Sequence, residues 1–469
     1  MDAQRKVIAV ILAAGDGKRM KSDRPKVLCE VLFMPMIRWV ETACRKAGIE
    51  DIYIVTGNHA EMVRAAVSEG CHFVCQAKRL GTGHAVMMAA DAIAQAQDVL
   101  VLNGDAPFIT AELIMQAYGQ HREQGYAATL FCAELENPYG YGRVLRGQDG
   151  RVRGIVEQKD ASPKQRAIRQ VNAGAYWFDA AFLARALSML TPANVQKEYY
   201  LTDTIGIAVQ EGLRVGGFVC PEQTAVLGAN DRAQLLELNE IARKMVLRRH
   251  LENGVEIPCA DGVIIGPEVE IEHDVCILPG SILKGRTKIG AHAQIGPNSW
   301  LVDSQVGEGT KILSSWLTDS SVGKNATIGP FSQLRPNSHL GDGVKIGDFV
   351  EVKNSTIGDK TSIAHLTYLG DSDVGEECNF GCGVVTANYN GKKKFRTKIG
   401  DRAFIGCNTN LIPPVQVGDG AYTAAGTTID RDVPDGAMAI GRVRQEIKEG
   451  WADSRIRFKG GSHKTDADK

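Results

Sequence analysis

Aliphatic residues recur at every sixth position through most of the second half of this 469-residue chain. A period of six fits neither the 3.6-residue period of an amphipathic helix nor the two-residue alternation of a half-buried strand. It fits stacked triangular coils, in which three hexads make one coil and every sixth side chain points into a shared aliphatic column. The first unbroken run is Ile265, Ile271, Ile277, Leu283, Ile289, Ile295 and Leu301, and later runs extend the pattern to Val417.

Glycine supports the same interpretation. It directly follows many hexad residues, as in Ile289-Gly290 and Ile346-Gly347, where a coil must turn a corner. Chance periodicity in a glycine-rich β domain is the alternative, but too many positions agree for it. Hexapeptide repeats of this kind resemble those of the hexapeptide acyltransferases, which implies a left-handed parallel β-helix.

A polar insertion interrupts the repeat between Phe380 and Ile399. Residues 381–398 read GCGVVTANYNGKKKFRTK. Long polar loops on a regular scaffold are usually functional. We therefore expect this segment to project from its own coil and to take part in a site.

The first half of the chain alternates apolar strands with helical stretches. Continuous apolar runs at Val7–Leu12, Asp51–Val55 and Asp98–Asn103 read as buried parallel strands. Helical patterns cover Met36–Lys46 and Ala60–Val67. This alternation predicts a mainly parallel, doubly wound α/β sheet of the Rossmann-like kind.

A glycine-rich loop follows the first strand and reads LAAGDGKRM, with Pro25-Lys26 shortly after it. It is neither a dinucleotide fingerprint nor a Walker A loop. The full string resembles the signature of the sugar-1-phosphate nucleotidyltransferases. Small residues allow the backbone to approach a base and phosphates, while Lys18, Arg19 and Lys26 supply positive charge for a triphosphate.

A carboxylate ends another predicted strand. Asp105 follows the run Leu102-Asn103-Gly104 and is therefore expected at the carboxyl edge of the sheet, where ligands bind in such folds. Mg²⁺ often takes only one or two protein oxygens and completes its shell with phosphates and water. Asp105 is thus a candidate Mg²⁺ ligand.

The order of these parts is more specific than either part alone. A nucleotidyltransferase domain, a helical linker and a long hexapeptide β-helix resemble the bacterial bifunctional N-acetylglucosamine-1-phosphate uridyltransferases/glucosamine-1-phosphate acetyltransferases, from Lys6 to about Trp451. We expect a uridyltransferase domain over residues 1–230, a helical linker over 231–251 and an acetyltransferase β-helix over 252–469. The last of these ends in a polar, disordered tail from Gly460 to Lys469.

The resemblance implies a uridyltransferase site that binds UTP and the nucleotide sugar, with Mg²⁺ held by Asp105 and Asn230. Asn103 departs from the family, in which an aromatic residue is familiar. The implied site residues are Leu12, Ala13, Ala14, Gly15, Arg19, Lys26, Gln76, Gly81, Thr82, Asn103, Gly104 and Asp105, with sugar contacts from Gly140, Glu157, Asn172 and Asn230.

The resemblance also implies an acetyltransferase site, whose strongest match is AHLTYLGD at Ala364–Asp371. Here His365 acts as the general base, and Glu351 is expected to orient its imidazole. Cys382 and Cys407 depart from the small residues expected there. Arg335, Lys353, Tyr368 and Asn379 are implied to bind the acceptor sugar phosphate, and Cys382, Asn388, Tyr389, Cys407, Ala425 and Arg442 to bind acetyl-CoA.

The charge balance and the cysteine content of the chain bear on its binding partners and its cellular location. The formal net charge is −1, so there is no global electrostatic reason to bind nucleic acid or an anionic membrane. The N-terminal sequence lacks the layout of a signal peptide, and the eleven scattered cysteines read as reduced thiols of a cytoplasmic protein. The family resemblance implies a homotrimer, because hexapeptide acyltransferases pack their flat faces around a threefold axis.

Two alternatives to the bifunctional enzyme stay open from the sequence. The chain could be a single-activity nucleotidyltransferase with a structural β-helix, or a non-catalytic scaffold of the same architecture. The clusters Cys71-His72-x-x-Cys75 and Cys378-x-x-x-Cys382 raise the separate question of a zinc site, but neither segment supplies four ligands at familiar spacing.

Overall fold

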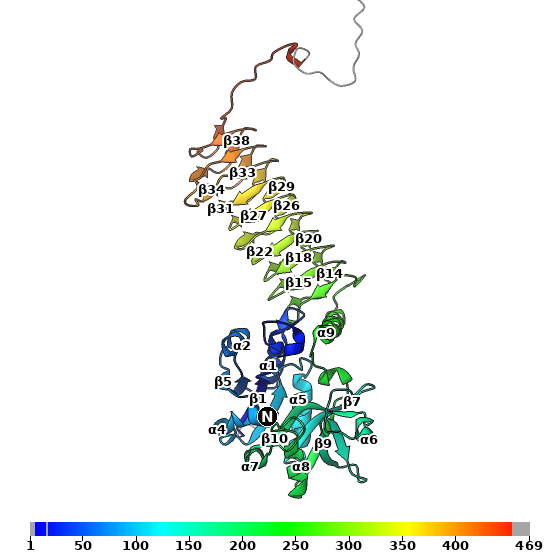
Figure 1. Ribbon diagram of the computed structural model, residues 1–469. Helices are drawn as coiled ribbons and strands as arrows, with labels where there is room; N and C mark the ends of the chain where they lie inside the picture. Colours follow the sequence, from blue (N-terminus) through cyan, green and yellow to red (C-terminus); the bar gives the residue numbers. More distant parts are fainter. Residues whose placement is uncertain (1–4, 16, 453–469) are drawn as a thin grey trace, which may run out of the picture. The chain divides into compact units, whose positions relative to one another are not determined.

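The computed structural model describes residues 5–15 and 17–452 of the chain (Figure 1). The chain divides into two compact units. The first comprises Met1–Gly254 with the short segments Ile264–Val269 and Leu283–Gly285, and the second holds Val255–Val263, Glu270–Ile282 and Arg286–Lys469. The predicted polar tail from Gly460 to Lys469 lies outside the described residues, as does Asp16.

The first unit is built on one large sheet whose strands run in the order β11-β7-β10-β6-β1-β4-β5. Around β1, the neighbouring strands pair parallel, as the apolar runs predicted. Only β10 reverses direction on this path, because it pairs antiparallel with both β6 and β7. The strands are β1 (Val7–Ala13), β4 (Ile52–Thr56), β5 (His72–Cys75), β6 (Asp98–Asn103), β7 (Ala128–Glu134), β10 (Gln170–Asp179) and β11 (Val215–Val219), with β8 (Arg143–Arg146) and β9 (Val152–Val156) attached beside β10.

Helices cover both faces of this sheet, which confirms the doubly wound arrangement. Successive residues of β1 point to opposite faces, so Ala9 and Ile11 join one apolar cluster while Ile8 and Val10 join the other. Helices α1 (Met36–Lys46) and α5 (Ala111–Glu123) pack on the first cluster. Helices α3 (Thr82–Met87), α7 (Ala180–Met189) and α8 (Asp203–Gln210) pack on the second.

A long helix, α9 (Arg232–Glu252), follows this sheet domain. It begins at Asp231, whose side chain accepts a hydrogen bond from the Gln234 N–H at 2.9 Å and so satisfies a free amide of the first turn. Leu235 and Leu238 are buried, whereas half of Leu251 is exposed. The apolar face of α9 therefore stops short of its last turn.

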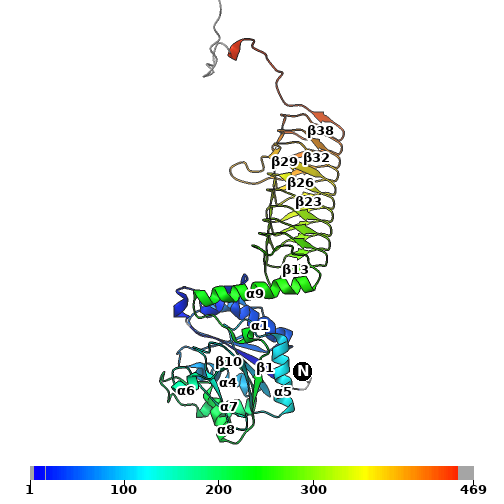
Figure 2. The same cartoon turned by 90° about the vertical axis from the view of Figure 1, so that its right-hand side faces the viewer.

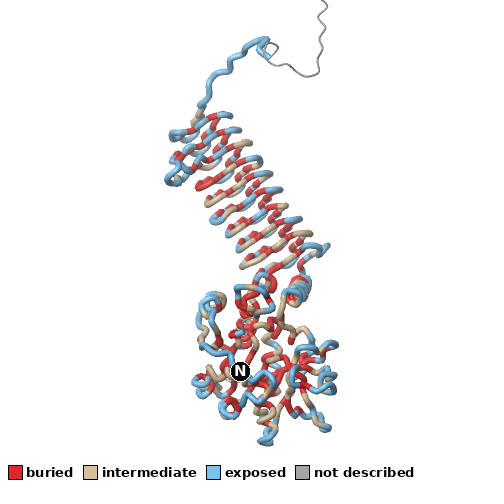
Figure 3. The backbone as a smooth tube through the Cα atoms, in the orientation of Figure 1, coloured by how far each residue is buried: buried red, intermediate tan, exposed pale blue. Residues whose placement is uncertain are grey.

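The second unit, continued by the short segments Ile264–Val269 and Leu283–Gly285, forms a parallel β-helix in which three sheets are the sides of a triangular coil. The sheets run from β12 (Ile264–Ile265) to β39 (Thr428–Ile429), from β13 (Glu270–Ile271) to β37 (Val415–Val417), and from β14 (Cys276–Ile277) to β40 (Met438–Ala439). Figure 3 shows the buried positions recurring inside each coil. Hexad residues such as Ile277, Ile295 and Ile312 are fully buried and stack on one another, which confirms the period of six.

The insertion leaves the coil between β33 (Val385–Thr386) and β34 (Thr397–Ile399), as Figure 2 shows. An antiparallel bridge between Tyr389 and Lys394 folds it into a short hairpin-like loop. All eleven cysteines are free thiols. Within the described ranges, no helix has the length and apolarity needed to span a lipid bilayer.

Candidate active sites

Two cavities open at the carboxyl ends of β1 and β6 in the first unit, and they share Leu12, Thr82, Asn103 and Asp105. The first, of about 310 Å³, is also lined by the predicted nucleotide-binding residues Ala14, Gly15, Lys26, Gln76 and Gly81. The second, of about 380 Å³, is also lined by Arg19 and by the predicted sugar-binding residues Gly140, Glu157, Asn172 and Asn230. Both volumes fall in the usual range of small-molecule sites.

Two predicted residues lie behind the cavities. Ala13 is only 4% exposed, and the Gly104 N–H donates to the Leu12 carbonyl at 3.0 Å. A side chain at position 104 would sit 3.0 Å from that same carbonyl oxygen. Gly104 therefore serves to bring two strand ends close together.

Glycine is required at two turns that shape the first cavity. Gly17 has φ +59°, and a Cβ there would lie 2.5 Å from Cβ of Lys26. Gly81 has φ +111°, and a Cβ there would lie 2.5 Å from the Tyr199 carbonyl oxygen. Both positions are closed to L side chains, so these glycines allow Lys26 and the start of α3 to reach the cavity edge.

Lys26, Asp105 and Asn230 meet at the boundary of the two cavities. The Lys26 ammonium forms an ion pair with the Asp105 carboxylate and donates to Asn230 Oδ1 at 3.1 Å. Two oxygen donors thus converge on one cationic group. A carboxylate and an amide oxygen around one point are the hard donors that Mg²⁺ takes from a protein, so these residues fit a metal ion at this place.

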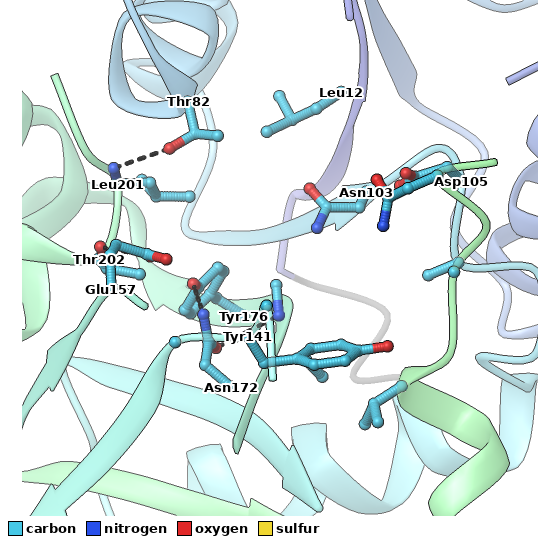
Figure 4. A pocket seen from close by; sticks show the side chains of 18 of the residues that line it. Leu12, Thr82, Asn103, Asp105, Tyr141, Glu157, Asn172, Tyr176, Leu201 and Thr202 are labelled. Carbon is cyan, nitrogen blue, oxygen red and sulfur yellow. Dashed lines mark hydrogen bonds between the residues drawn. The ribbon is translucent and has the colours of Figure 1, made fainter. Parts of the chain in front are cut away.

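The second cavity is lined by paired polar groups, which Figure 4 shows around an open centre. Thr202 Oγ1 donates to Glu157 Oε1 at 3.2 Å, and the Asn172 amide donates to the Tyr176 hydroxyl at 2.6 Å. Burial raises the pKa of Glu157 above its usual range. Such oriented donors and acceptors are suited to the hydroxyl groups of a sugar.

Two lining residues escaped the sequence analysis because they come from separate elements: Tyr176 lies on β10, and Thr202 precedes α8. Thr202 gave no signal in the sequence, since its partner Glu157 lies 45 positions earlier. Tyr139 and Tyr141 also line the cavity, within residues 136–143, whose sequence resembles the family's sugar-binding strands.

In the β-helix, His365 stands at the end of β29 (Ser362–His365), with 59% of its side chain exposed. Its Nδ1 lies 2.9 Å from Oδ1 of Asp348, the residue beneath it in β26 (Lys345–Asp348). The expectation that Glu351 orients the imidazole is wrong. Glu351 instead accepts from the Arg335 guanidinium at 2.8 Å, because the coil register places it under Tyr368.

Three of the predicted coenzyme A residues lie above His365, at the equivalent corner of the coils that follow it. Strands β29, β32 (Asn379–Phe380), β35 (Phe404–Ile405) and β38 (Tyr422–Thr423) stack in register, which places Cys382, Cys407 and Ala425 at the matching corner positions. The Arg442 guanidinium donates to the Ala425 carbonyl. Cys407 is exposed and Cys382 is half-buried.

A cationic group lies at a different corner of the coil, after β24 (Gln333–Leu334) and β27 (Glu351–Lys353). The neighbouring Lys394 ammonium lowers the pKa of Lys353, and the Arg335 charge acts in the same direction. Three cations therefore gather beside β30 (Tyr368–Gly370). Lys394 belongs to the insertion and was not predicted from the sequence. It is one of three consecutive lysines, and the sequence does not show which of them lies next to Lys353.

The remaining predicted residues divide between these corners. The Asn388 amide lies 3.4 Å from the Tyr368 hydroxyl and also donates to Asp371, so the insertion is anchored beside the cationic group. Tyr389 is 59% exposed, and Asn379 lies exposed on the sheet of His365. One chain thus carries its imidazole and its cationic group at two separate corners.

An exposed apolar column runs beside the His365 corner. Phe331, Phe349 and Leu366 occupy equivalent positions in three successive coils and are 57–62% exposed. The rings of Phe331 and Phe349 stack with centroids 5.7 Å apart. A contiguous apolar surface of this kind is typical of a protein interface.

Comparisons with known proteins find a matching family for each of the two units. Residues 8–223 match the family described as "Nucleotidyl transferase", and residues 319–354 and 396–431 match "Bacterial transferase hexapeptide (six repeats)". The chain is 48% identical to "Bifunctional protein GlmU" of Acetivibrio thermocellus over 95% of this chain and 97% of the relative. Proteins of the same name from Clostridium acetobutylicum and Clostridioides difficile are 45% and 44% identical, each over 95% of this chain and 98% and 97% of their own length.

Proposed function

The chain belongs to the family of the bifunctional GlmU proteins, and from that premise we propose that it acetylates glucosamine 1-phosphate and then uridylylates the product. Acetyl-CoA and UTP are the donors, and UDP-N-acetylglucosamine and pyrophosphate are the final products. The product is a precursor for peptidoglycan, lipopolysaccharide and other cell-envelope polysaccharides. The observation that carries the proposal is the presence of both constellations in one chain: Lys26, Asp105 and Asn230 in one unit, and His365 with Asp348 in the other.

In uridylyl transfer, the sugar phosphate attacks the α-phosphorus of UTP and pyrophosphate leaves. The cavity lined by Gly15 and Gln76 takes the nucleotide, and the cavity lined by Glu157 and Asn172 takes the sugar. Lys26 neutralises phosphate charge between them. Asp105 and Asn230 would hold Mg²⁺, which supplies further charge neutralisation when bound. The protein's part is to place two polyanions in line.

In acetyl transfer, the amine nitrogen of the sugar attacks the thioester carbon. The N–C bond forms, the C–S bond breaks, and the amine proton must be removed. His365 Nδ1–H donates to Asp348, which leaves Nε2 free to accept that proton. The same hydrogen bond lowers the pKa of Asp348 and so keeps its carboxylate ionised. Arg335 and Lys353 bind the sugar phosphate, with Lys394 beside them, and Asn379 positions the acceptor.

We assign coenzyme A to the column above His365, where Cys382, Cys407, Ala425 and Arg442 lie in or beside successive coils. We also assign residues 1–230 to uridylyl transfer, 231–251 to a linker and 252–469 to acetyl transfer. A cytoplasmic location fits its proposed small-molecule substrates.

We propose that the protein is a homotrimer whose acetyl sites lie between subunits. Two observations support this. Phe331, Phe349 and Leu366 leave an apolar column exposed beside His365, and a second copy would bury it. The imidazole and the cationic group lie at different corners of one coil, so a neighbouring chain could complete the site.

The alternative is a nucleotidyltransferase whose β-helix is only structural. The accessible His365–Asp348 pair argues against it. Incubation with glucosamine 1-phosphate, acetyl-CoA, UTP and Mg²⁺, with free thiol and pyrophosphate measured separately, decides between them. Absence of thiol release, with normal pyrophosphate release from N-acetylglucosamine 1-phosphate and UTP, would favour the structural β-helix.

The two activities should be separable. A fragment ending near Arg249 retains both cavities and the residues that line them. We expect it to form UDP-N-acetylglucosamine from UTP and N-acetylglucosamine 1-phosphate, and to release no thiol from acetyl-CoA. Loss of uridylyl transfer in a folded fragment would mean that the β-helix unit is needed for the first site.

Subunit mixing tests the shared acetyl site. His365→Ala and Lys353→Ala chains should each be inactive in acetyl transfer. The first lacks the imidazole at one corner of the coil, and the second lacks a phosphate-binding cation at the other. After exchange of subunits, some interfaces would combine an intact His365 with an intact Lys353 from another chain, and part of the thiol release should return. A monomeric mass by light scattering contradicts the trimer, and demonstrated mixing without rescue places each site within one chain.

A further inference from the structure

A cluster of metal-binding side chains lies on the first two coils of the β-helix, away from the residues assigned above. His273 and Asp274 occupy the corner between β13 and β14, and His292 occupies the same corner one coil later, between β16 (Lys288–Ile289) and β17 (Gln294–Ile295). Their ligand atoms all lie within 4.8 Å of one another. In the part of the chain that the structure describes, no other group of three such donors comes this close.

Both imidazoles present the same atom to the same oxygen. His273 Nδ1 lies 2.8 Å from Asp274 Oδ2, and His292 Nδ1 lies 3.9 Å from that oxygen. The two rings meet edge to face with centroids 5.5 Å apart. Two nitrogens and one carboxylate oxygen thus converge from two coils.

The backbone beneath this cluster is fixed on both sides of the corner. Strand hydrogen bonds join Glu272 N–H to the Ile289 carbonyl at 3.0 Å and Cys276 N–H to the Ala293 carbonyl at 2.9 Å. The Glu272 carboxylate also accepts from the Ala291 N–H at 2.8 Å. Donors mounted on a regular ladder need only side-chain rotation to bind a metal ion, which is how precise sites are built.

From this arrangement we propose that His273, Asp274 and His292 form a binding site for a divalent transition-metal ion, with Zn²⁺ the fitting ion. Two imidazoles with one carboxylate suit Zn²⁺, whereas Mg²⁺ and Ca²⁺ prefer all-oxygen shells. The three side chains are 56–66% exposed, so water completes the coordination shell and the ion exchanges with solvent. The ion links the first coil to the second. The first coil of a solenoid has a neighbouring coil on one side only, so a link at this end stabilises the coil with the fewest contacts.

Zinc titration of the full chain, freed of metal by a chelator, tests the site. Wild-type protein should bind Zn²⁺ in a calorimetric titration, and His292→Ala should raise the dissociation constant at least about tenfold, the lower limit for disturbing metal ligation. Asp274→Asn should weaken binding in the same sense. The matched control is His339→Ala, an exposed histidine of the same β-helix whose Nδ1 bonds Ser321 and not a carboxylate. It should bind like wild type.

A second readout separates this site from the free thiols, which also bind zinc. Zn²⁺ should raise the thermal unfolding midpoint of wild-type and His339→Ala protein, and this rise should be lost in His292→Ala. The midpoint of each variant without zinc shows whether it is folded. Equal affinities for wild type and a folded His292→Ala protein, or no binding to wild type in the micromolar range, would overturn the site.

Discussion

Replacing Asp105 with alanine is expected to lower uridylyl transfer by at least about 10²-fold, the scale for removing one group that stabilises developing charge. Acetyl transfer should stay near the wild-type rate. Asp105 pairs with Lys26 at the point where the two cavities meet, so its loss removes the proposed metal ligand and also the partner of the Lys26 ammonium. Pyrophosphate and free thiol, measured separately on the same preparation, report the two activities.

The matched control is Asp91→Ala, which removes an exposed carboxylate from α4 (Ala90–Ile93) of the same unit. It should leave both activities unchanged. Raising the Mg²⁺ concentration should recover part of the rate of an Asp105→Asn protein, because an amide oxygen still offers one weak ligand. Near-normal pyrophosphate release by a folded Asp105→Ala protein would remove this residue from the metal site.

Replacing His365 with alanine is expected to slow acetyl transfer by about 10²–10⁴-fold, the usual contribution of a general base. Uridylyl transfer should be spared, since the residues proposed for it lie in the other unit. His339→Ala serves as the control. Thiol release within about tenfold of wild type from a folded His365→Ala protein would mean that another group accepts the proton.

Asp348 gives this prediction a second test, because it acts only through the imidazole. Asp348→Asn keeps the shape of the side chain but removes the charge that faces His365 Nδ1. We expect a smaller loss in kcat than in His365→Ala, because the imidazole stays in place but loses the carboxylate that fixes its orientation. A kcat equal to that of wild type in a folded Asp348→Asn protein would deny Asp348 this positioning role.

Local spacing was enough to predict much of this molecule. The period of six identified the β-helix and its inward residues, because covalent spacing alone decides which side chains share one face of a repeating coil. The apolar run before the glycine loop likewise predicted β1, and the run before Asp105 predicted its place at the sheet edge. The hexad period and the apolar runs depend only on the spacing of residues along the chain, which can be counted directly in the sequence.

The partners of the site residues were decided only by the tertiary structure. Coils of the β-helix differ in length, so the residue under His365 is set by the accumulated register, and it is Asp348 and not Glu351. Lys394 approaches Lys353 because a hairpin-like loop folds back.

Long-range convergence explains the other residues that the sequence analysis missed. Thr202 meets Glu157, and His292 faces Asp274, across stretches of chain whose path depends on the packing of whole strands and coils. The sequence by itself thus determined the two architectures and the residues at their edges. Which of those residues touch one another was decided by three-dimensional register, because contacts between distant segments follow from packing and not from spacing.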